Sequence, residues 1–87
     1  MNMKTLEDFQ PQIRNVLRDY GRLKRDAGEL DADDDLYQFG MTSHASVNVM
    51  LALEGEFDVE FPDAMLKRNV FNSIESINTA LSELQAA

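Results

Sequence analysis

Residues 35–63, DLYQFGMTSHASVNVMLALEGEFDVEFPD, are the stretch that decides the fold. Its centre predicts a helix from Thr42 or Ser43 to about Glu56. The apolar side chains of this helix go nearly all the way round its axis: Ala45, Val47, Val49, Met50, Leu51, Ala52 and Leu53. A chain of 87 residues cannot bury a helix on every side. We therefore expect one side to pack in the core and another to face a partner or a ligand.

The segment before this helix predicts a first helix and a long loop. The first helix is expected from about Thr5 to Arg25, with Thr5 as a possible N-cap and with Pro11 either kinking the helix or marking its regular start. The loop from Asp26 to Thr42 is long for so small a domain and is expected to be anchored rather than flexible. Apolar residues at steps of three or four support the helix, and three more anchor the loop: Leu6, Phe9, Ile13, Val16, Leu17, Tyr20 and Leu23, then Leu36, Phe39 and Met41.

The segment after this helix predicts two more helices. Pro62 and Asp63 begin a short helix that runs through Arg68, and Ser73 is the expected N-cap of a final helix. The final helix has its apolar stripe at Ile74, Ile77, Leu81 and Leu84. The expected fold is therefore a small all-α bundle, a single domain over residues 1–87, with three main helices, one short third helix and a long loop after the first helix. Residues 1–4 and 85–87 are expected to be frayed.

Charge and composition narrow the possible functions. Sixteen acidic and eight basic residues give a formal charge of −8, which disfavours nucleic acid as a partner, and residues 26–64 hold eleven acids and no base. A charged partner of that segment should be basic, although an acidic face that only keeps the protein soluble is the alternative. The longest apolar run, residues 49–53, is too short for a membrane span or a secretory signal, so we expect a soluble, cytoplasmic monomer. The absence of cysteine excludes disulfides, thiolate metal sites and a cysteine nucleophile.

Two chemical motifs in the sequence do not meet the requirements of their chemistry. The run Asp31-x-Asp33-x-Asp35 suggests a calcium loop, but Leu36 stands where an EF-hand needs glycine and Thr42 stands where it needs glutamate. The single histidine, His44, directly follows Ser43, and neighbouring helical side chains point about 100° apart, so the two do not form a nucleophile and its base. We therefore expect neither an enzyme nor a metal site.

Two parts of the quoted stretch share one family resemblance. The first is Asp35-Leu36, an aromatic residue, and then Gly40-Met41-Thr42-Ser43 before the central helix; the second is the segment from Leu53 to Asp63, LEGEFDVEFPD. Together they resemble the acyl carrier protein and thiolation-domain family, over about residues 30–85. The sequence departs from the family pattern at Thr42, where aspartate is usual, and at His44, where an apolar residue is usual. Ala45, Asn48 and Gly55 also replace common acidic or polar residues, so helix 43–56 is less acidic than is usual.

The resemblance implies that Ser43 is an attachment point rather than a catalyst. A phosphopantetheinyl transferase would join 4′-phosphopantetheine to its hydroxyl, flanked by Gly40, Met41, Thr42 and His44, and the thiol of the arm would hold acyl or aminoacyl groups as thioesters. Loading ligases and the acyl-processing enzymes of a specialised fatty-acid or secondary-metabolite pathway would be the partners, and the cargo stays open between fatty acyl, polyketide and amino acid. The expected docking residues are Asp35, Val47, Met50, Glu54, Glu56 and Asp58, and the expected acyl cleft is lined by Met50, Leu53, Phe61, Met65 and Ile74. The alternatives are that Ser43 only caps the helix, that the cleft residues are plain core, and that the protein is an unmodified acidic helical interaction module.

Overall fold

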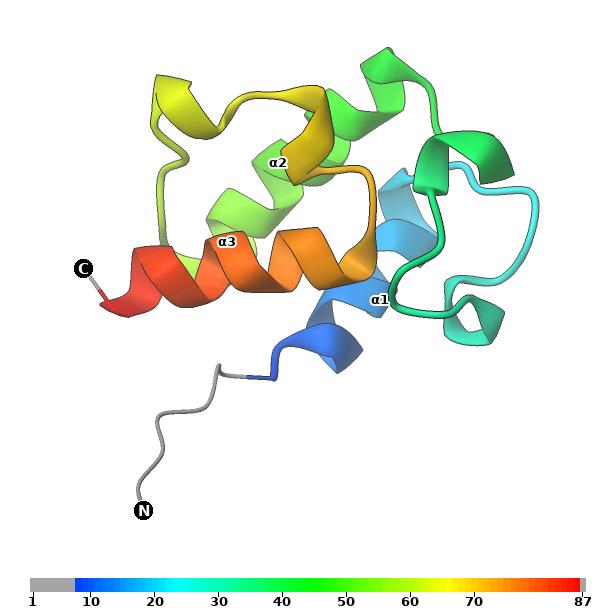
Figure 1. Cartoon of the computed structure of the whole chain (residues 1–87), viewed down its shortest axis with the longest axis horizontal. Coiled ribbons are helices and arrows are strands. Elements are labelled where there is room, and N and C mark those ends of the chain that lie inside the picture. The colour runs from blue at the N-terminus through cyan, green and yellow to red at the C-terminus, as the bar shows by residue number, and fades with distance from the viewer. Residues whose placement is uncertain (1–7, 87) are drawn as a thin grey trace.

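The computed structural model describes residues 8–86, with only the backbone of Ala86, and these residues form a purely helical fold (Figure 1). Its three α-helices are α1 (Gln10–Tyr20), α2 (Ser43–Phe57) and α3 (Ile74–Ala86). Four single 3₁₀ turns complete it: η1 (Ala27–Glu29), η2 (Leu36–Phe39), η3 (Asp63–Met65) and η4 (Arg68–Val70). The described residues contain no strand, which confirms the expected all-α class.

Helix α1 is shorter than its apolar pattern suggested. It begins at Gln10 with Pro11 in its first turn. A proline there breaks no helical hydrogen bond, because the N–H groups of the first turn have no acceptor within the helix. The carboxylate of Asp8 accepts the amide N–H of Gln10 at 3.1 Å. The helix ends at Tyr20, because Arg22 adopts a left-handed conformation with φ of 57° that no helix can continue through. The expectation of a helix to Arg25 was therefore wrong, and the expected N-cap Thr5 lies outside the described residues.

The long connection between α1 and α2 is tied down by hydrogen bonds. The guanidinium of Arg14 donates to the carbonyls of Ala27 and Leu30, at 2.6 and 2.7 Å. The amide N–H of Leu36 donates to the carbonyl of Asn72 at 2.7 Å, which joins the loop to the segment just before α3. The side chain of Leu36 is fully buried. These contacts confirm that the loop is anchored, and they fix the position from which α2 starts.

The segment between α2 and α3 contains two separate turns rather than the short helix expected from Pro62 to Arg68. Turn η3 ends before Leu66, whose ψ of 61° is not helical, and the extended backbone of Lys67 separates it from η4. Figure 1 shows this segment, yellow to orange, arching from the end of α2 back to the start of α3. Its exposed apex brings Leu66, Lys67 and Arg68 to the surface.

Helix α3 begins as predicted and runs further than expected. The hydroxyl oxygen of Ser73 accepts the amide N–H of Ser76 at 3.0 Å, which is the expected N-cap contact. At the other end the helix continues to Ala86, and residues 1–4 and 87, which we also expected to be frayed, lie outside the described residues. The side-chain amide of Gln85 donates to the carbonyl of Phe57 at 3.1 Å and holds this end against the last turn of α2.

The core lies between the three α-helices. Its fully buried side chains include Leu17 of α1, Leu53 of α2, and Ile77 and Leu81 of α3. At the C-terminal end of α2, the rings of Phe9 and Phe57 pack edge to face with their centroids 5.0 Å apart. The N-terminal end of α2 lies about 20 Å away, along a helix of 15 residues. The candidate functional site described below lies at this end.

Candidate functional site

Helix α2 is capped by Thr42 rather than by Ser43. The hydroxyl oxygen of Thr42 accepts the amide N–H of Ala45 at 3.0 Å, while its carbonyl accepts the amide N–H of Ser46 at 2.9 Å. Its backbone is extended, as an N-cap requires. Threonine thus performs the capping at the position where the resembled family usually has aspartate. Ser43 becomes the first residue inside the helix.

The hydroxyl of Ser43 is exposed and makes no hydrogen bond with any described residue. Only its carbonyl is engaged, by the hydroxyl of Ser46 at 2.7 Å. The amide N–H groups of Ser43 and His44 belong to the first helical turn and have no acceptor among the described residues. Free donors and the positive end of the helix dipole favour a negative charge at this point. The arrangement therefore suits an oxygen that is to become part of a phosphodiester.

Gly40 and Met41 fix the chain directly before the site. Gly40 adopts φ of 107°, and a Cβ atom there would lie 3.0 Å from Cγ of Lys24 and be strained by the backbone conformation alone. Met41 is almost fully buried, and its amide N–H donates to the carbonyl of Leu36 at 3.2 Å. The chain thus turns at Gly40 and is anchored at Met41, which leaves Thr42, Ser43 and His44 exposed.

A groove of about 320 Å³ opens beside Ser43. It lies between the first half of α2, Tyr37 of η2 and the segment from Leu66 to Phe71. Its lining is largely apolar but includes two cations and no acid: Tyr37, Ser43, Ser46, Val47, Met50, Leu66, Lys67, Arg68 and Phe71. The guanidinium carbon of Arg68 lies 3.7 Å from the centroid of the Tyr37 ring, a cation–π contact.

The groove shares only one residue with the predicted acyl cleft. Met50 lines it, whereas Leu53, Phe61 and Ile74 are buried in the core. Met65 lines a different depression, with Val70 and Ala80. For those three buried residues the plain-core alternative describes the structure. Sequence reasoning missed Tyr37, Ser46, Leu66, Lys67, Arg68 and Phe71, and one signal could have found two of them: Lys67 and Arg68 are the only bases after residue 25.

The predicted docking residues fall into two groups. Val47, Glu56 and Asp58 are exposed, and Val47 has half of its surface accessible. Asp35, which is also exposed, and Glu54 each have a carboxylate that stabilises local structure, and the remaining docking residue, Met50, lines the groove. The carboxylate of Asp35 accepts the amide N–H of Tyr37 at 3.0 Å and caps η2, and that of Glu54 accepts the amide N–H of Phe61 at 2.9 Å.

The exposed apolar side of α2 consists of Val47 and Leu51, which are 50% and 54% accessible. They lie four residues apart and so on one face of the helix. The opposite face buries Ala45, Val49 and Leu53. This division confirms that one side of the helix packs in the core while another is left uncovered.

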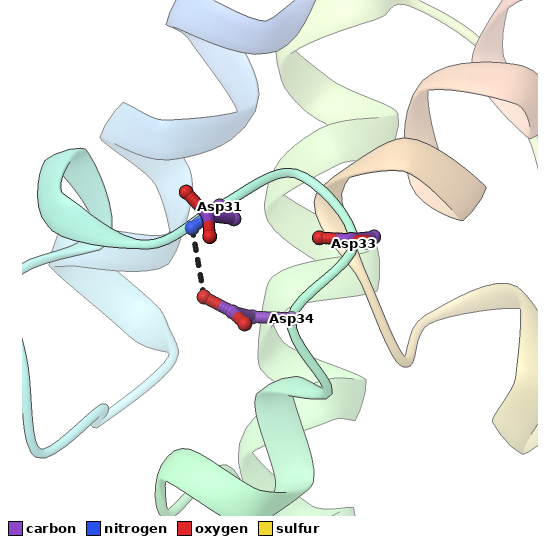
Figure 2. Close-up of side chains that lie close together, drawn as sticks. All are labelled: Asp31, Asp33 and Asp34. Atoms are coloured by element: carbon purple, nitrogen blue, oxygen red, sulfur yellow. Dashed lines mark hydrogen bonds between the residues drawn. The ribbon is translucent and has the colours of Figure 1, made fainter.

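The acidic loop brings three carboxylates together (Figure 2). Oxygens of Asp31, Asp33 and Asp34 lie within 4.8 Å of one another. The carboxylate of Asp34 already accepts the amide N–H of Asp31 at 2.7 Å, and the amide N–H of Asp34 donates back to the carbonyl of Asp31 at 3.0 Å. These bonds describe a tight turn stabilised by its own side chain. Asp35, the third residue of the calcium-like run, is not in the group because it caps η2.

Among the carboxyl groups of residues 8–86, one in the loop after α1 has a displaced pKa. The pKa of Asp26 is lowered from its ordinary value, first by a hydrogen bond from the Arg18 side chain and then by one from the amide N–H of Gly28. The Arg18 Nε to Asp26 Oδ1 distance is 3.0 Å. These bonds hold the loop against α1.

No helix among residues 8–86 combines the length and the apolar character that crossing a membrane requires. This finding agrees with the short apolar runs of the sequence.

Comparison with known proteins gives a consistent result. The family described as "Phosphopantetheine attachment site" matches residues 12–81. The chain is 43% identical over 65 residues to the aminoacyl carrier protein of Agrobacterium fabrum, an alignment that covers 75% of this chain and 78% of the relative. It is 29% identical over 79 residues to the D-alanyl carrier protein of Bacillus subtilis, covering 90% and 99%.

A solved structure agrees with these relatives. It contains an engineered glycine:[carrier protein] ligase of Bradyrhizobium japonicum complexed with a carrier protein of Agrobacterium tumefaciens and ATP. The superposition has a TM-score of 0.84 and 37% identity, and it covers 87% of this chain and 99% of the other.

Proposed function

The chain belongs to the phosphopantetheine-attachment family of carrier proteins, which are not themselves enzymes, and on that premise we propose that Ser43 bears its phosphopantetheine and that aminoacyl groups are its cargo. Phosphopantetheine would supply the thiol on which cargo is held as a thioester, because the chain itself has no cysteine. The observation that supports Ser43 most strongly is its unpartnered, exposed hydroxyl, which is free because Thr42 caps the helix.

The residues around Ser43 fit such an attachment. The donor of the group is coenzyme A. As the bond from Ser43 Oγ to the phosphorus next to pantetheine forms, the hydroxyl proton leaves to a base of the transferase. The phosphoanhydride bond of coenzyme A breaks, and adenosine 3′,5′-bisphosphate leaves. The new phosphodiester anion would lie at the N-terminal end of α2, beside the unused amide N–H groups of Ser43 and His44. Gly40 and Met41 would hold the preceding chain in place during the transfer.

The aminoacyl cargo is supported by the relatives rather than by the groove. Both are named as carriers of amino acids, and the similar solved structure holds a glycine ligase. Nothing in these comparisons favours the fatty-acid or secondary-metabolite pathway that we expected. We propose that a phosphopantetheinyl transferase and an amino acid:carrier protein ligase are the partners, that loading occurs in the cytoplasm, and that the exposed side chains of Val47 and Leu51 contact the ligase.

Intact-mass measurement tests the attachment site. The chain, a Ser43→Ala variant and a Ser46→Ala control are each expressed with a broad-specificity phosphopantetheinyl transferase. Ser46 lines the same groove one turn further along the helix, so it is a matched control. We expect the wild-type chain and Ser46→Ala each to gain one phosphopantetheine, and Ser43→Ala to gain none. An unmodified wild-type chain, or a modified Ser43→Ala variant, would contradict the assignment.

A second measurement tests the cargo. The modified chain is incubated with ATP and either an amino acid:carrier protein ligase with glycine or D-alanine, or an acyl-carrier ligase with a fatty acid. We expect the mass of an aminoacyl group to appear, and to be removed by hydroxylamine, which cleaves thioesters. Loading by the fatty-acid ligase alone would refute the aminoacyl assignment while leaving Ser43 in place.

A further inference from the structure

We propose that the exposed side chains of Arg22 and Lys24 form a docking surface for an acidic patch of the amino acid:carrier protein ligase. This inference rests on the proposed function, in which such a ligase loads the arm on Ser43. It differs from the sequence-based expectation that a charged partner should be basic, because that expectation came from the acidic residues of the middle segment. The polarity of the contact beside Ser43 is then the opposite of that expected for those acids.

The two cations lie beside the turn that leads to Ser43. The amide N–H of Lys24 donates to the carbonyl of Phe39 at 2.8 Å, which joins the segment after α1 to this turn. A Cβ atom at Gly40 would lie 3.0 Å from Cγ and 3.5 Å from Cε of Lys24, so the aliphatic part of that side chain runs along Gly40. The carbonyl oxygen of Arg22 lies 3.6 Å from the same point. In Figure 1 the cyan segment after α1 passes beside the green turn that leads into α2, so an enzyme that encloses Ser43 and its arm would meet both cations.

Both cations are available to an external anion. The ion pairs of residues 8–86 have Arg18 and Arg25 as their basic members, and neither Arg22 nor Lys24 takes part in one. The backbone of Arg22 is left-handed, with φ of 57°. This conformation is unfavourable for a residue that has a Cβ atom, and such strain occurs more often at functional positions than elsewhere.

The part of the chain around Ser43 contains no acid that could neutralise these cations. Residues 36–53 include no aspartate or glutamate, although the net charge of the chain is −8. The first acid after them, Glu54, is about 16 Å from Ser43 along α2. That separation is about twice the screening length at physiological ionic strength, which is about 8 Å. The surface beside Ser43 is therefore complementary to an acidic patch.

The acids that lie closest to the two cations in the sequence have other contacts. The carboxylate of Asp26 is paired with Arg18. That of Asp35 caps η2. Asp19 lines a depression between α1 and α2 together with Glu56, which belongs to the last turn of α2. These acids therefore leave the charge of the two cations free to attract a partner.

The alternative is that the two cations contact the phosphodiester of the chain's own arm. The two possibilities differ in the unmodified chain, which has no arm but keeps its surface. An unmodified chain that docks on the ligase inhibits the loading of the modified one, and its inhibition constant measures the contact between the two proteins alone.

The experiment uses the ligase that loads the wild-type chain in the cargo measurement above. It compares the wild type with an Arg22→Gln/Lys24→Gln variant, an Arg22→Glu/Lys24→Glu variant and a Gln12→Glu/Ala64→Glu control. The control changes the net charge by as much as the glutamine variant does, at exposed positions of α1 and η3. Intact mass and thermal unfolding first confirm that each protein carries one phosphopantetheine and is folded.

We expect the KM for loading to rise about fivefold in the glutamine variant with kcat nearly unchanged, as the loss of two exposed charge contacts predicts. The glutamate variant should show a larger rise, because acids then face acids, and the control should resemble the wild type. Raising the salt concentration should raise the KM of the wild type more than that of the glutamine variant. The inhibition constants of the unmodified chains should rise in the same order as the KM values.

The remaining outcomes would overturn the proposal in different ways. Equal KM values in the wild type and both Arg22 and Lys24 variants would show that the surface does not dock, and an equal rise in the control would assign the effect to net charge. A lower KM in the glutamate variant would indicate a basic partner. A raised KM with unchanged inhibition constants, or an unmodified wild type that does not inhibit, would assign the cations to the arm. A wild-type chain that carries its arm but is loaded by no amino acid:carrier protein ligase would overturn the proposed cargo and this inference together.

Discussion

The hydroxyl oxygen of Thr42 accepts the amide N–H of Ala45 at 3.0 Å. Because Thr42 caps the helix, Ser43 does not have to serve both as the cap and as the attachment point. Thr42 stabilises the helix, and Ser43 keeps a free hydroxyl at the same helix end. Modification of Ser43 therefore removes no capping contact, so the fold should tolerate both the free and the modified states. Stability and attachment can be tested one at a time.

Thr42→Ala should lower the free energy of unfolding by about 1 kcal/mol, the typical loss of an N-cap side chain. Thr42→Asp should retain stability, because its carboxylate can accept the same N–H and interacts favourably with the helix dipole. Urea unfolding followed by circular dichroism measures both. Thr79→Ala is the control, since that hydroxyl bonds a carbonyl within α3 and caps nothing. Equal midpoints for Thr42→Ala and wild type would show that Thr42 does not act as the cap.

Gly40→Ala and Gly55→Ala should change stability in opposite directions. At Gly40 the left-handed φ and the nearby Lys24 side chain should make alanine unfavourable by about 1–2 kcal/mol. At Gly55, within α2, an added Cβ would meet no atom within 4 Å, and alanine should raise stability by about 0.5–1 kcal/mol. Thermal unfolding of both variants checks the signs. A stabilising Gly40→Ala would mean that the turn before Ser43 can relax.

Val47→Asp should impair loading by an amino acid:carrier protein ligase without unfolding the protein. Val47 is half exposed on the uncovered side of α2, so the substitution places a charge where we propose that the ligase makes an apolar contact. We expect kcat/KM for loading to fall about tenfold, with unfolding changed by less than about 0.5 kcal/mol. Asn48→Asp, which adds the same charge at the next exposed position, should load almost normally. Equal losses in both variants would point to net charge rather than to this contact.

The hydrogen bonds to Asp26 predict a loss of stability in acid. Because the pKa of Asp26 is lowered in the folded state, the carboxylate contributes stability above its unfolded pKa, about 4, and that contribution is lost as the pH falls through the folded pKa. Asp26→Asn should therefore be less stable than wild type at pH 7, and the difference should narrow as the pH is lowered below 4. Denaturation midpoints from pH 7 to pH 2 measure this. Asp19→Asn removes the same charge from an exposed residue of α1 and is the control for net charge.

The sequence predicted α2 and the N-cap Ser73 because each depends on local chemistry, and it predicted the anchored loop from apolar residues such as Leu36, which is buried. A run of apolar residues that is preceded by Gly40 and Thr42 strongly favours a helix. The C-terminal end of α1 was predicted wrongly, since apolar periodicity persists to Leu23 while the backbone turns away at Arg22. The short helix expected after Pro62 became two turns for a similar reason, the non-helical backbone of Leu66 and Lys67.

The groove could not be predicted in the same way. Whether Leu53 or Leu66 faces outward depends on how the segment after α2 folds back, and that is a property of the tertiary structure. Met50 lines the groove, whereas Phe61 and Ile74 lie in the core, and an apolar side chain does not by itself indicate which surface it covers. The charge pattern indicated more about the groove than the apolar pattern did, since Lys67 and Arg68 are the only lysine and arginine after residue 25.

The two apolar side chains that we place in contact with the ligase, Val47 and Leu51, are both exposed, and neither belongs to the buried core. Substitutions at such positions usually alter folding free energy by less than about 0.5 kcal/mol. Mutation can therefore change which ligase this protein meets while natural selection keeps the same scaffold, and the recognition surface is free to diverge faster than the helices beneath it.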